Sequence, residues 1–164
     1  MQIAGAVMGQ DVRTRIAYTD TSVFGGVFDE ESEASSKAFF SLVGSGRFSL
    51  LISDVTRQEI AFAPDHVQAH FEKLLAFVQL VPVDEPVLAL RDAYVAAGVI
   101  TAKWAEDAAH VAAATVAQAD LIVSWNFRHI VHFDKIRLYN AVNAMEDYRP
   151  LEIRSPLEVI DYED

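Results

Sequence analysis

The sequence predicts an α/β fold with three layers, in which helices cover both faces of a central parallel sheet. Short apolar segments alternate along the chain with amphipathic helical patterns, the arrangement that builds parallel sheets. One of these segments, Leu121-Ile-Val123, lacks any polar alternation, which is typical of a strand buried on both faces. With 164 residues, 52% of them apolar, the chain fits one domain spanning residues 1–164. Residues 1–13 have no periodicity, and we expect a loose terminus there.

The predicted strands are short, apolar segments bounded by turn-forming or polar residues. They are residues 15–20, 48–53, 80–83, 121–124 and 151–153. The first strand ends at the carboxylate Asp20, and Thr21 with the later pair Gly25-Gly26 turns the chain into a short helical stretch. Pro82 in the third strand favours a position at the sheet edge, because proline cannot donate to a strand ladder.

Helical patterns lie between these strands. They cover residues 29–43, 54–60, 64–78, 84–97, 103–119 and 134–147, and a short helix starts at residue 155. Acidic Asp29-Glu-Glu31 is expected to open the first of them and Gly44-Ser-Gly46 to end it. Thr56 and Glu59 have the spacing of a capping box. Gly98 ends the fourth, and Pro156 suits the first position of the last helix.

Four side chains with oxygen ligands are predicted at one edge of this sheet. Asp20 ends the first strand, and Asn126 follows the fourth. Glu59 lies in the helix that leaves the second strand, and Asp107 lies in the first turn of the helix that runs back into the fourth. Ligands bind such sheets beyond the carboxyl ends of the strands. Converging carboxylates repel one another unless a cation lies among them, and hard oxygen ligands suit Mg²⁺ or Mn²⁺. Such ions activate water and neutralise charge on a phosphate.

The composition excludes several classes of protein and site. There are no cysteines, which excludes disulfides, thiolate zinc sites and a cysteine nucleophile. The net charge of −11 excludes nucleic-acid binding by overall charge, so a polyanionic substrate requires local positive charge or metal ions. The same acidic charge also suits simple solubility. With no bilayer-spanning apolar run and no signal-peptide pattern, we expect a cytoplasmic protein without a membrane partner.

Several motifs, taken in order, resemble the PIN-domain family, which includes the VapC-type toxin ribonucleases of bacterial toxin–antitoxin pairs. They are Asp20-Thr-Ser22, Glu59 after Ser53-Asp-Val-Thr, Asp107-Ala-Ala-His-Val-Ala-Ala-Ala, and Ala119-Asp-Leu-Ile-Val-Ser-Trp-Asn126. The resemblance covers residues 15–153. It implies the sheet order 3-2-1-4-5 and Mg²⁺- or Mn²⁺-dependent hydrolysis of RNA by a metal-activated water. It also implies an RNA substrate, an antitoxin partner and a homodimer as candidate partners.

The resemblance assigns roles to particular residues. Asp20, Glu59 and Asp107 would be metal ligands, with Ser22 and Ser124 supporting the site by hydrogen bonds. Asn126 departs from the family pattern, because many members have a fourth aspartate there. An amide oxygen still ligates a metal or holds its water, but one negative charge is lost and a second metal binds more weakly.

Other interpretations of these residues stay open. Asp20 also suits a turn, Glu59 a capping box, and Asn126 an N-cap for residues 127–130. A lone histidine such as His110 is most often a packing or hydrogen-bonded residue, and Trp125 and Phe127 are expected to pack rather than stack on bases. Three cations near this edge, Arg57, Lys103 and Arg128, are either phosphate contacts or ordinary surface charges.

Two other functions compete with the ribonuclease. One is a catalytically weak or inactive PIN-like module that acts through protein partners, which Asn126 and the acidic charge favour. The other is a phosphatase or phospho-acceptor domain. The haloacid type of phosphatase needs Asp-x-Asp after the first strand, whereas Asp20 is followed by Thr21 and Ser22. A receiver domain needs an early acidic pair and a late lysine, and neither is evident.

Overall fold

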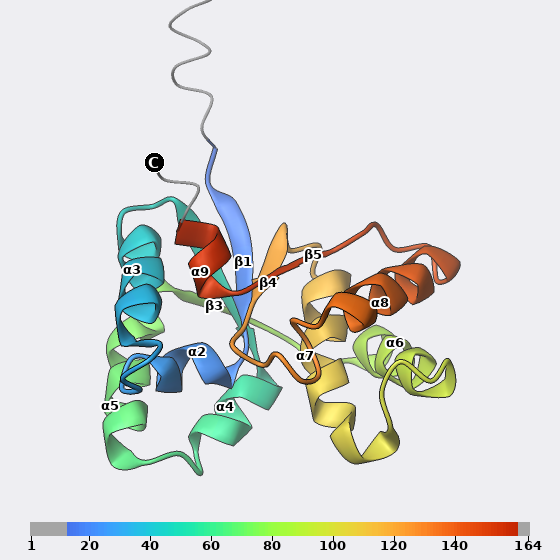
Figure 1. Ribbon diagram of the computed structural model, residues 1–164, viewed down its shortest axis with the longest axis horizontal. Helices are drawn as coiled ribbons and strands as arrows, with labels where there is room; N and C mark the ends of the chain where they lie inside the picture. Colours follow the sequence, from blue (N-terminus) through green and yellow to red (C-terminus); the bar gives the residue numbers. More distant parts are fainter. Residues whose placement is uncertain (1–12, 161–164) are drawn as a thin grey trace, which may run out of the picture.

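The computed structural model describes residues 13–160 and has five parallel strands between two groups of helices (Figure 1). The strands are β1 (Arg15–Thr19), β2 (Phe48–Ser53), β3 (Val78–Val81), β4 (Leu121–Val123) and β5 (Glu152–Arg154). Their order in the sheet is β3-β2-β1-β4-β5, and each neighbouring pair is parallel. The predicted α/β class and strand order are confirmed. The expected loose terminus falls almost wholly on residues 1–12, which lie outside the described range.

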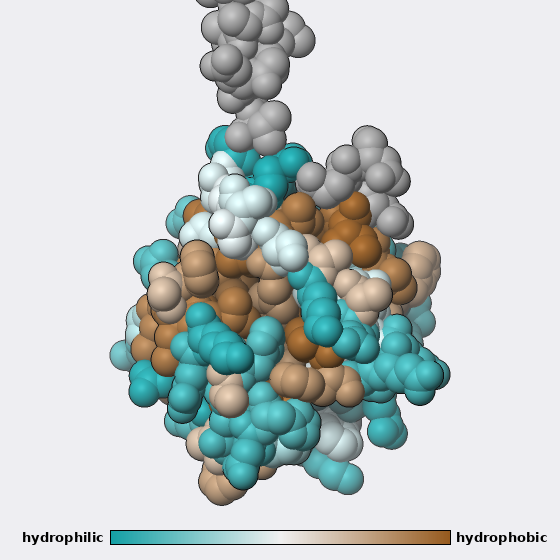
Figure 2. Space-filling view, turned by 90° about the vertical axis from the view of Figure 1, so that its left-hand side faces the viewer, coloured by the Kyte–Doolittle hydropathy of each residue, from teal (hydrophilic) through white to brown (hydrophobic). Residues whose placement is uncertain are grey.

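The helices form the two outer layers. The α-helices are α2 (Thr21–Gly26), α3 (Glu33–Gly44), α4 (Asp54–Ile60), α5 (Asp65–Leu74), α6 (Glu85–Ala96), α7 (Ala105–Val116), α8 (Phe133–Met145) and α9 (Pro156–Ile160). Two short 3₁₀ helices, η1 (Leu75–Phe77) and η2 (Ala102–Trp104), complete the set. In Figure 1, α2, α3, α5 and α9 lie on the left of the sheet, and α6, α7 and α8 lie on the right. Figure 2 looks at the face of α3 and α5, where apolar and polar side chains alternate.

Each face of the sheet has its own hydrophobic core, because successive strand residues point to opposite faces. In β4, Leu121 and Val123 join the core beneath α2, α3 and α5, while Ile122 joins the core beneath α6, α7 and α8. All three side chains are buried, which confirms the prediction of a strand covered on both faces.

The small side chains of α7 let this helix lie close to its neighbours. Residues Ala108 to Thr115 are all buried, and the helix packs against α6 and the sheet. Alanine contributes little bulk, so the backbones approach closely along the whole length of α7. This packing fixes the first turn of α7, where Asp107 lies.

Several predicted boundaries are wrong. Asp29 to Glu31 precede α3, which begins at Glu33 after the N-cap Ser32. The helical pattern expected through Val78 ends at Leu74, and β3 covers residues 78–81 instead of 80–83. Val78 already pairs with Leu50 of β2, so the strand ladder overrides the helical spacing. The edge position of this strand is confirmed, with Pro82 just after it.

The parallel order brings the carboxyl ends of the strands to the lower edge of the sheet in Figure 1. Asp20 directly follows β1, and Ser124 directly follows β4. The helices α2 and α4 begin at this edge, and α7 also begins there before it leads back into β4. Among the described helices, none is long and apolar enough to cross a membrane.

Candidate active site

Asp20 is held at the end of β1 by two serines, one two residues further along the chain and the other 104 residues away. Its side chain is only 4% exposed. Ser22 donates to Oδ1 at 2.6 Å, and Ser124 donates to Oδ2 at 2.8 Å. The serine oxygens in turn accept backbone N–H groups, Ser22 from Trp125 and Ser124 from Asn126, each at 2.9 Å. Both supporting serines predicted from the sequence therefore lie against the carboxylate, whose position is fixed from two segments.

Glu59 contacts the site and not the cap of its own helix. Its Oε1 accepts a hydrogen bond from Thr21 Oγ1 at 2.6 Å and lies 2.7 Å from Nε2 of His110. The cap of α4 is formed instead by Ser53, which accepts from Val55 N and pairs with Thr56 in a capping box. The expected pairing of Thr56 with Glu59 is wrong, because Ser53 already occupies the N-cap position.

His110 lies at the centre of a buried chain of hydrogen bonds. Its side chain is 1% exposed, and its Nδ1 lies 2.7 Å from the hydroxyl of Tyr18 in β1. That hydroxyl lies 2.7 Å from Ser53 Oγ at the end of β2. A histidine that donates from both nitrogens satisfies every step, because Tyr18 then accepts from His110 and donates to Ser53. The chain ties Glu59 on α4 to α7, β1 and the end of β2.

Asp107 and Asn126 meet across the space between α7 and the segment after β4. Burial raises the pKa of Asp107, and the Asn126 side chain lies near enough to oppose part of that rise. The Asn126 Oδ1 accepts the backbone N–H of His129 at 2.9 Å. Asn126 therefore caps the turn that follows β4, as one of the two interpretations expected, and its membership of the site stays a prediction.

Burial and neighbouring charges shift the pKa values of four ionisable groups of this site in different directions. Burial raises the pKa of Asp20, and His110 and the two serines only partly oppose the rise. Burial likewise raises the pKa of Asp107. Burial would also raise the pKa of Glu59, but the hydrogen bond and charge of His110 outweigh it and lower that pKa. Burial opposes the charged form of His110, yet Tyr18, Glu59 and Asp20 raise its pKa to about 10.

The donor set has the chemistry that a hard divalent cation requires. Carboxylate, amide and hydroxyl oxygens converge at one edge, and the raised pKa values of Asp20 and Asp107 mark negative charge that is costly without a cation. Within residues 13–160, however, no three acidic or histidine side chains are grouped closely enough to hold a metal ion.

The three predicted cations differ in their surroundings. Arg57 lies 3.8 Å from Asp54 on its own helix, as an exposed ion pair. Lys103 Nζ and Arg128 Cζ instead lie 5.1 Å and 5.8 Å from the ring centre of Trp104. The Trp104 ring also stacks on His129, with ring centres 4.6 Å apart. Lys103 and Arg128 thus gather around one aromatic side chain close to Asp107.

Of the two aromatic residues expected to pack, only one does. The Trp125 indole donates to Ser36 Oγ at 2.8 Å and lies close to the backbone of Gly26. Phe127 contacts Trp125 only edge to face, with ring centres 6.0 Å apart, and is 52% exposed. The prediction of a packing role is wrong for Phe127, because the turn capped by Asn126 directs that residue outward.

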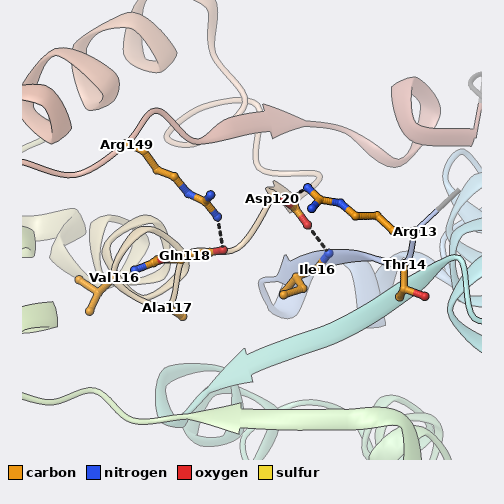
Figure 3. Close-up of a pocket in the computed structure, with 8 residues that line it drawn as sticks. All are labelled: Arg13, Thr14, Ile16, Val116, Ala117, Gln118, Asp120 and Arg149. Carbon is orange, nitrogen blue, oxygen red and sulfur yellow. Dashed lines mark hydrogen bonds and ion pairs between the residues drawn. The ribbon is translucent and has the colours of Figure 1, made fainter. Parts of the chain in front are cut away.

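A surface pocket of about 400 Å³ lies at the opposite edge of the sheet (Figure 3). Asp120 there accepts a hydrogen bond from the backbone of Ile16 at 2.7 Å, and Arg149 donates to the carbonyl of Gln118 at 2.7 Å. These two hydrogen bonds join the segment after α7 to β1 and to Arg149. The pocket contains none of the acidic residues predicted to form the site.

The family model of the PIN domain matches residues 18–128, which is more than half of the chain. The chain belongs to the PIN-domain family. Members of this family are typically nucleases and generally bind divalent metals. The matched range includes Asp20, Glu59, Asp107 and Asn126.

The fold is also similar to that of one solved structure. It is described as VapBC2 from Rickettsia felis bound to a DNA fragment from their promoter. The two chains are 13% identical with a TM-score of 0.55, and the match covers 85% of this chain and 98% of the other. At that identity the likeness establishes the shared fold. No curated protein matches the sequence.

His110 is the residue of this site that sequence analysis did not assign. It follows Asp107 by three positions, which places both on one face of a helix. Its burial within an alanine-rich helix marks it as a polar group that needs partners. The partners come from β1 and α4, however, so no local pattern identifies them.

Proposed function

We propose that this PIN domain is a divalent-metal-dependent ribonuclease and the toxin of a toxin–antitoxin pair. The observation that carries the proposal is the fixed position of Asp20, which Ser22 and Ser124 hold within range of the charge of Glu59. The charge of Glu59 also acts on Asp107. A buried carboxylate costs free energy, and two serines from separate segments hold this one in place. The family to which the chain belongs gives the arrangement its chemical meaning.

In this proposal Asp20, Glu59 and Asp107 bind Mg²⁺ or Mn²⁺, and Asn126 contributes an amide at the same edge. The ion supplies a water of lowered pKa and positive charge against the scissile phosphate. The serines hold both oxygens of Asp20, so that carboxylate is preorganised. His110 holds Glu59 at the edge of the site and prevents it from turning toward its own helix.

The proposal includes the partners that the family suggests. RNA is the substrate, and an antitoxin protein inhibits the enzyme in the pair. The similar Rickettsia felis structure, named as a VapBC2 complex, supports such a partner. A homodimer is proposed as the state of the toxin itself.

Cleavage of RNA by the purified chain tests the proposal. We expect Mn²⁺ or Mg²⁺ to stimulate cleavage of a labelled single-stranded RNA and EDTA to abolish it. Asp20→Asn should lose at least about 100-fold in rate, since it removes a ligand charge. Asp92→Asn changes an exposed acid on α6 in the same way and should leave the rate unchanged. Equal cleavage by Asp20→Asn and the unaltered protein would refute the mechanism.

A second function has two features in its favour. No three acidic or histidine groups in residues 13–160 are placed to hold an ion, and Asn126 replaces an acid. These features suit a catalytically weak or inactive module that acts through protein partners. Titration calorimetry with Mn²⁺ separates the two, because the partner-binding module predicts no heat of metal binding.

A further inference from the structure

The loop between β4 and α8, residues 126–132, exposes an aromatic ring next to the acidic site. The first residue of this part of the loop, Asn126, lies near enough to Asp107 to act on the pKa of that carboxylate. The next residue, Phe127, is 52% exposed and touches Trp125 only through an edge-to-face contact. A half-exposed phenylalanine ring is an apolar surface on which a flat ring can stack.

The same loop contributes to a cluster of positive charge. Arg128 and Lys103 both lie against Trp104, and no ion pair within residues 13–160 joins either of them to a carboxylate. Burial lowers the pKa of His129, Asp107 opposes this, and the nearby charges of Arg128 and Lys135 lower it further. Lys103 and Arg128 therefore place two cationic side chains against Trp104, in a chain whose net charge is −11.

We propose that the 126–132 loop and Lys103 form a binding site for unpaired RNA, in which a base stacks on Phe127 and Lys103 and Arg128 bind backbone phosphates. The inference rests on the proposed function for its choice of RNA as ligand. Stacking on a protein ring requires a base that is free of its own strand, whereas a paired base in a duplex presents only its edges. The site therefore selects single-stranded segments.

The arrangement also gives the bound strand a place relative to the acidic residues. Phe127 is adjacent in sequence to Asn126, and Lys103 lies four residues before Asp107. A nucleotide stacked on Phe127 thus has its neighbouring phosphates at the edge where Asp20 and Asp107 lie. Arg57, on the opposite side and beside Asp54, has no part in this contact.

Binding of a labelled RNA in EDTA tests this inference without cleavage. The probe is a fluorescein-labelled single-stranded RNA of 12 nucleotides of mixed sequence, and fluorescence anisotropy gives its Kd. Phe127→Leu keeps an apolar side chain but removes the ring, and we expect about fivefold weaker binding, the lower end of base–aromatic stacking. Phe77→Leu is the matched control, because Phe77 is also 52% exposed but precedes β3 at the opposite edge of the sheet.

The phosphate contacts are tested by the salt dependence of the same Kd. For single strands the slope of log affinity against log salt changes by about 0.7 for each phosphate contact. The double variant Lys103→Gln/Arg128→Gln should therefore lose about 1.4 from the slope, or about 25-fold in affinity at 0.1 M salt. Lys73→Gln/Arg149→Gln makes the same change of charge away from the loop and should keep the slope.

Three results would overturn the inference. The first is unchanged binding of the single-stranded RNA by Phe127→Leu. The second is an unchanged salt slope for the variant of Lys103 and Arg128. The third is a loss of affinity for a fully paired RNA duplex in these variants that equals their loss of affinity for the single strand. If the unaltered chain binds no single-stranded RNA, the inference also fails, and the exposed ring is then a protein contact. Binding without any metal-dependent cleavage would refute the nuclease proposal and leave this site standing.

Discussion

Replacing His110 with glutamine should remove most of the pH dependence of stability of the metal-free protein between pH 6 and pH 9. His110 is buried, and its neighbours Tyr18, Glu59 and Asp20 raise its pKa to about 10 from 6.5. Because the pKa is higher in the folded state, folding is favoured wherever the folded protein holds a proton that the unfolded chain releases. This stabilisation is complete below pH 6.5 and is lost as the pH rises toward 10.

The size of the effect follows from the two pKa values. With 6.5 in the unfolded chain and about 10 in the folded protein, the free energy of unfolding falls by about 3 kcal/mol between pH 6 and pH 9. A folded pKa one unit lower changes the result little, because most of the loss already lies within this range. The lowered pKa of Glu59 reflects the same contact and is not added again.

Urea unfolding in EDTA, followed by tryptophan fluorescence at pH 6, 7, 8 and 9, measures this difference. His110→Gln should be less stable than the unaltered protein at pH 6, and the two should converge toward pH 9. His132→Gln, a change of an exposed histidine, should keep the original slope. Equal stability of the unaltered protein at pH 6 and pH 9 would refute a buried charged histidine, as would an equally steep loss in His110→Gln.

The remaining predictions concern the carboxylates and one glycine. Asp20→Asn should raise the melting temperature of the metal-free protein at pH 7. Burial raises the pKa of Asp20, so the charged carboxylate destabilises the fold at this pH. A lower melting temperature of the variant would contradict this. Asn126→Asp should lower the melting temperature of the metal-free protein, since it replaces the amide near Asp107 with a like charge. Mn²⁺ should raise the melting temperature of this variant more than that of the unaltered protein. Gly26→Ala should cost about 1–3 kcal/mol in urea unfolding, because its Cβ would lie 2.6 Å from a serine hydroxyl and 2.8 Å from an indole nitrogen, whereas Gly25→Ala meets nothing within 4 Å and should cost far less.

The acidic site shows how far local sequence patterns predict the positions of side chains. The positions of Asp20 at the end of a strand and of Asn126 after the next strand in the sheet were predictable, because apolar strands and the helix that leads into β4 have clear periodicity. The topology then brought both residues to one edge. The partners of Asp20, by contrast, come from α2 and from the segment after β4, 2 and 104 residues away in sequence.

Glu59 shows how a local rule fails at such a site. Its spacing from Thr56 matches a capping box, and that pattern alone cannot distinguish a cap from a ligand. In the folded chain Ser53 is the cap, and Glu59 binds Thr21 and His110. The distant partners decide the role, because a charged histidine outcompetes a backbone amide for a carboxylate.

The α/β class, most strand positions and the chain segments that supply the acidic residues are predictable without the structure. These follow from hydrophobic periodicity, turn residues and the order of motifs, all of which act over short distances along the chain. The contacts of His110 with Glu59 and Tyr18, and the exposure of Phe127, appear only in the folded chain. The physical reason is that burial and the pairing of polar groups depend on elements far apart in sequence, which meet only when the sheet and α7 pack together.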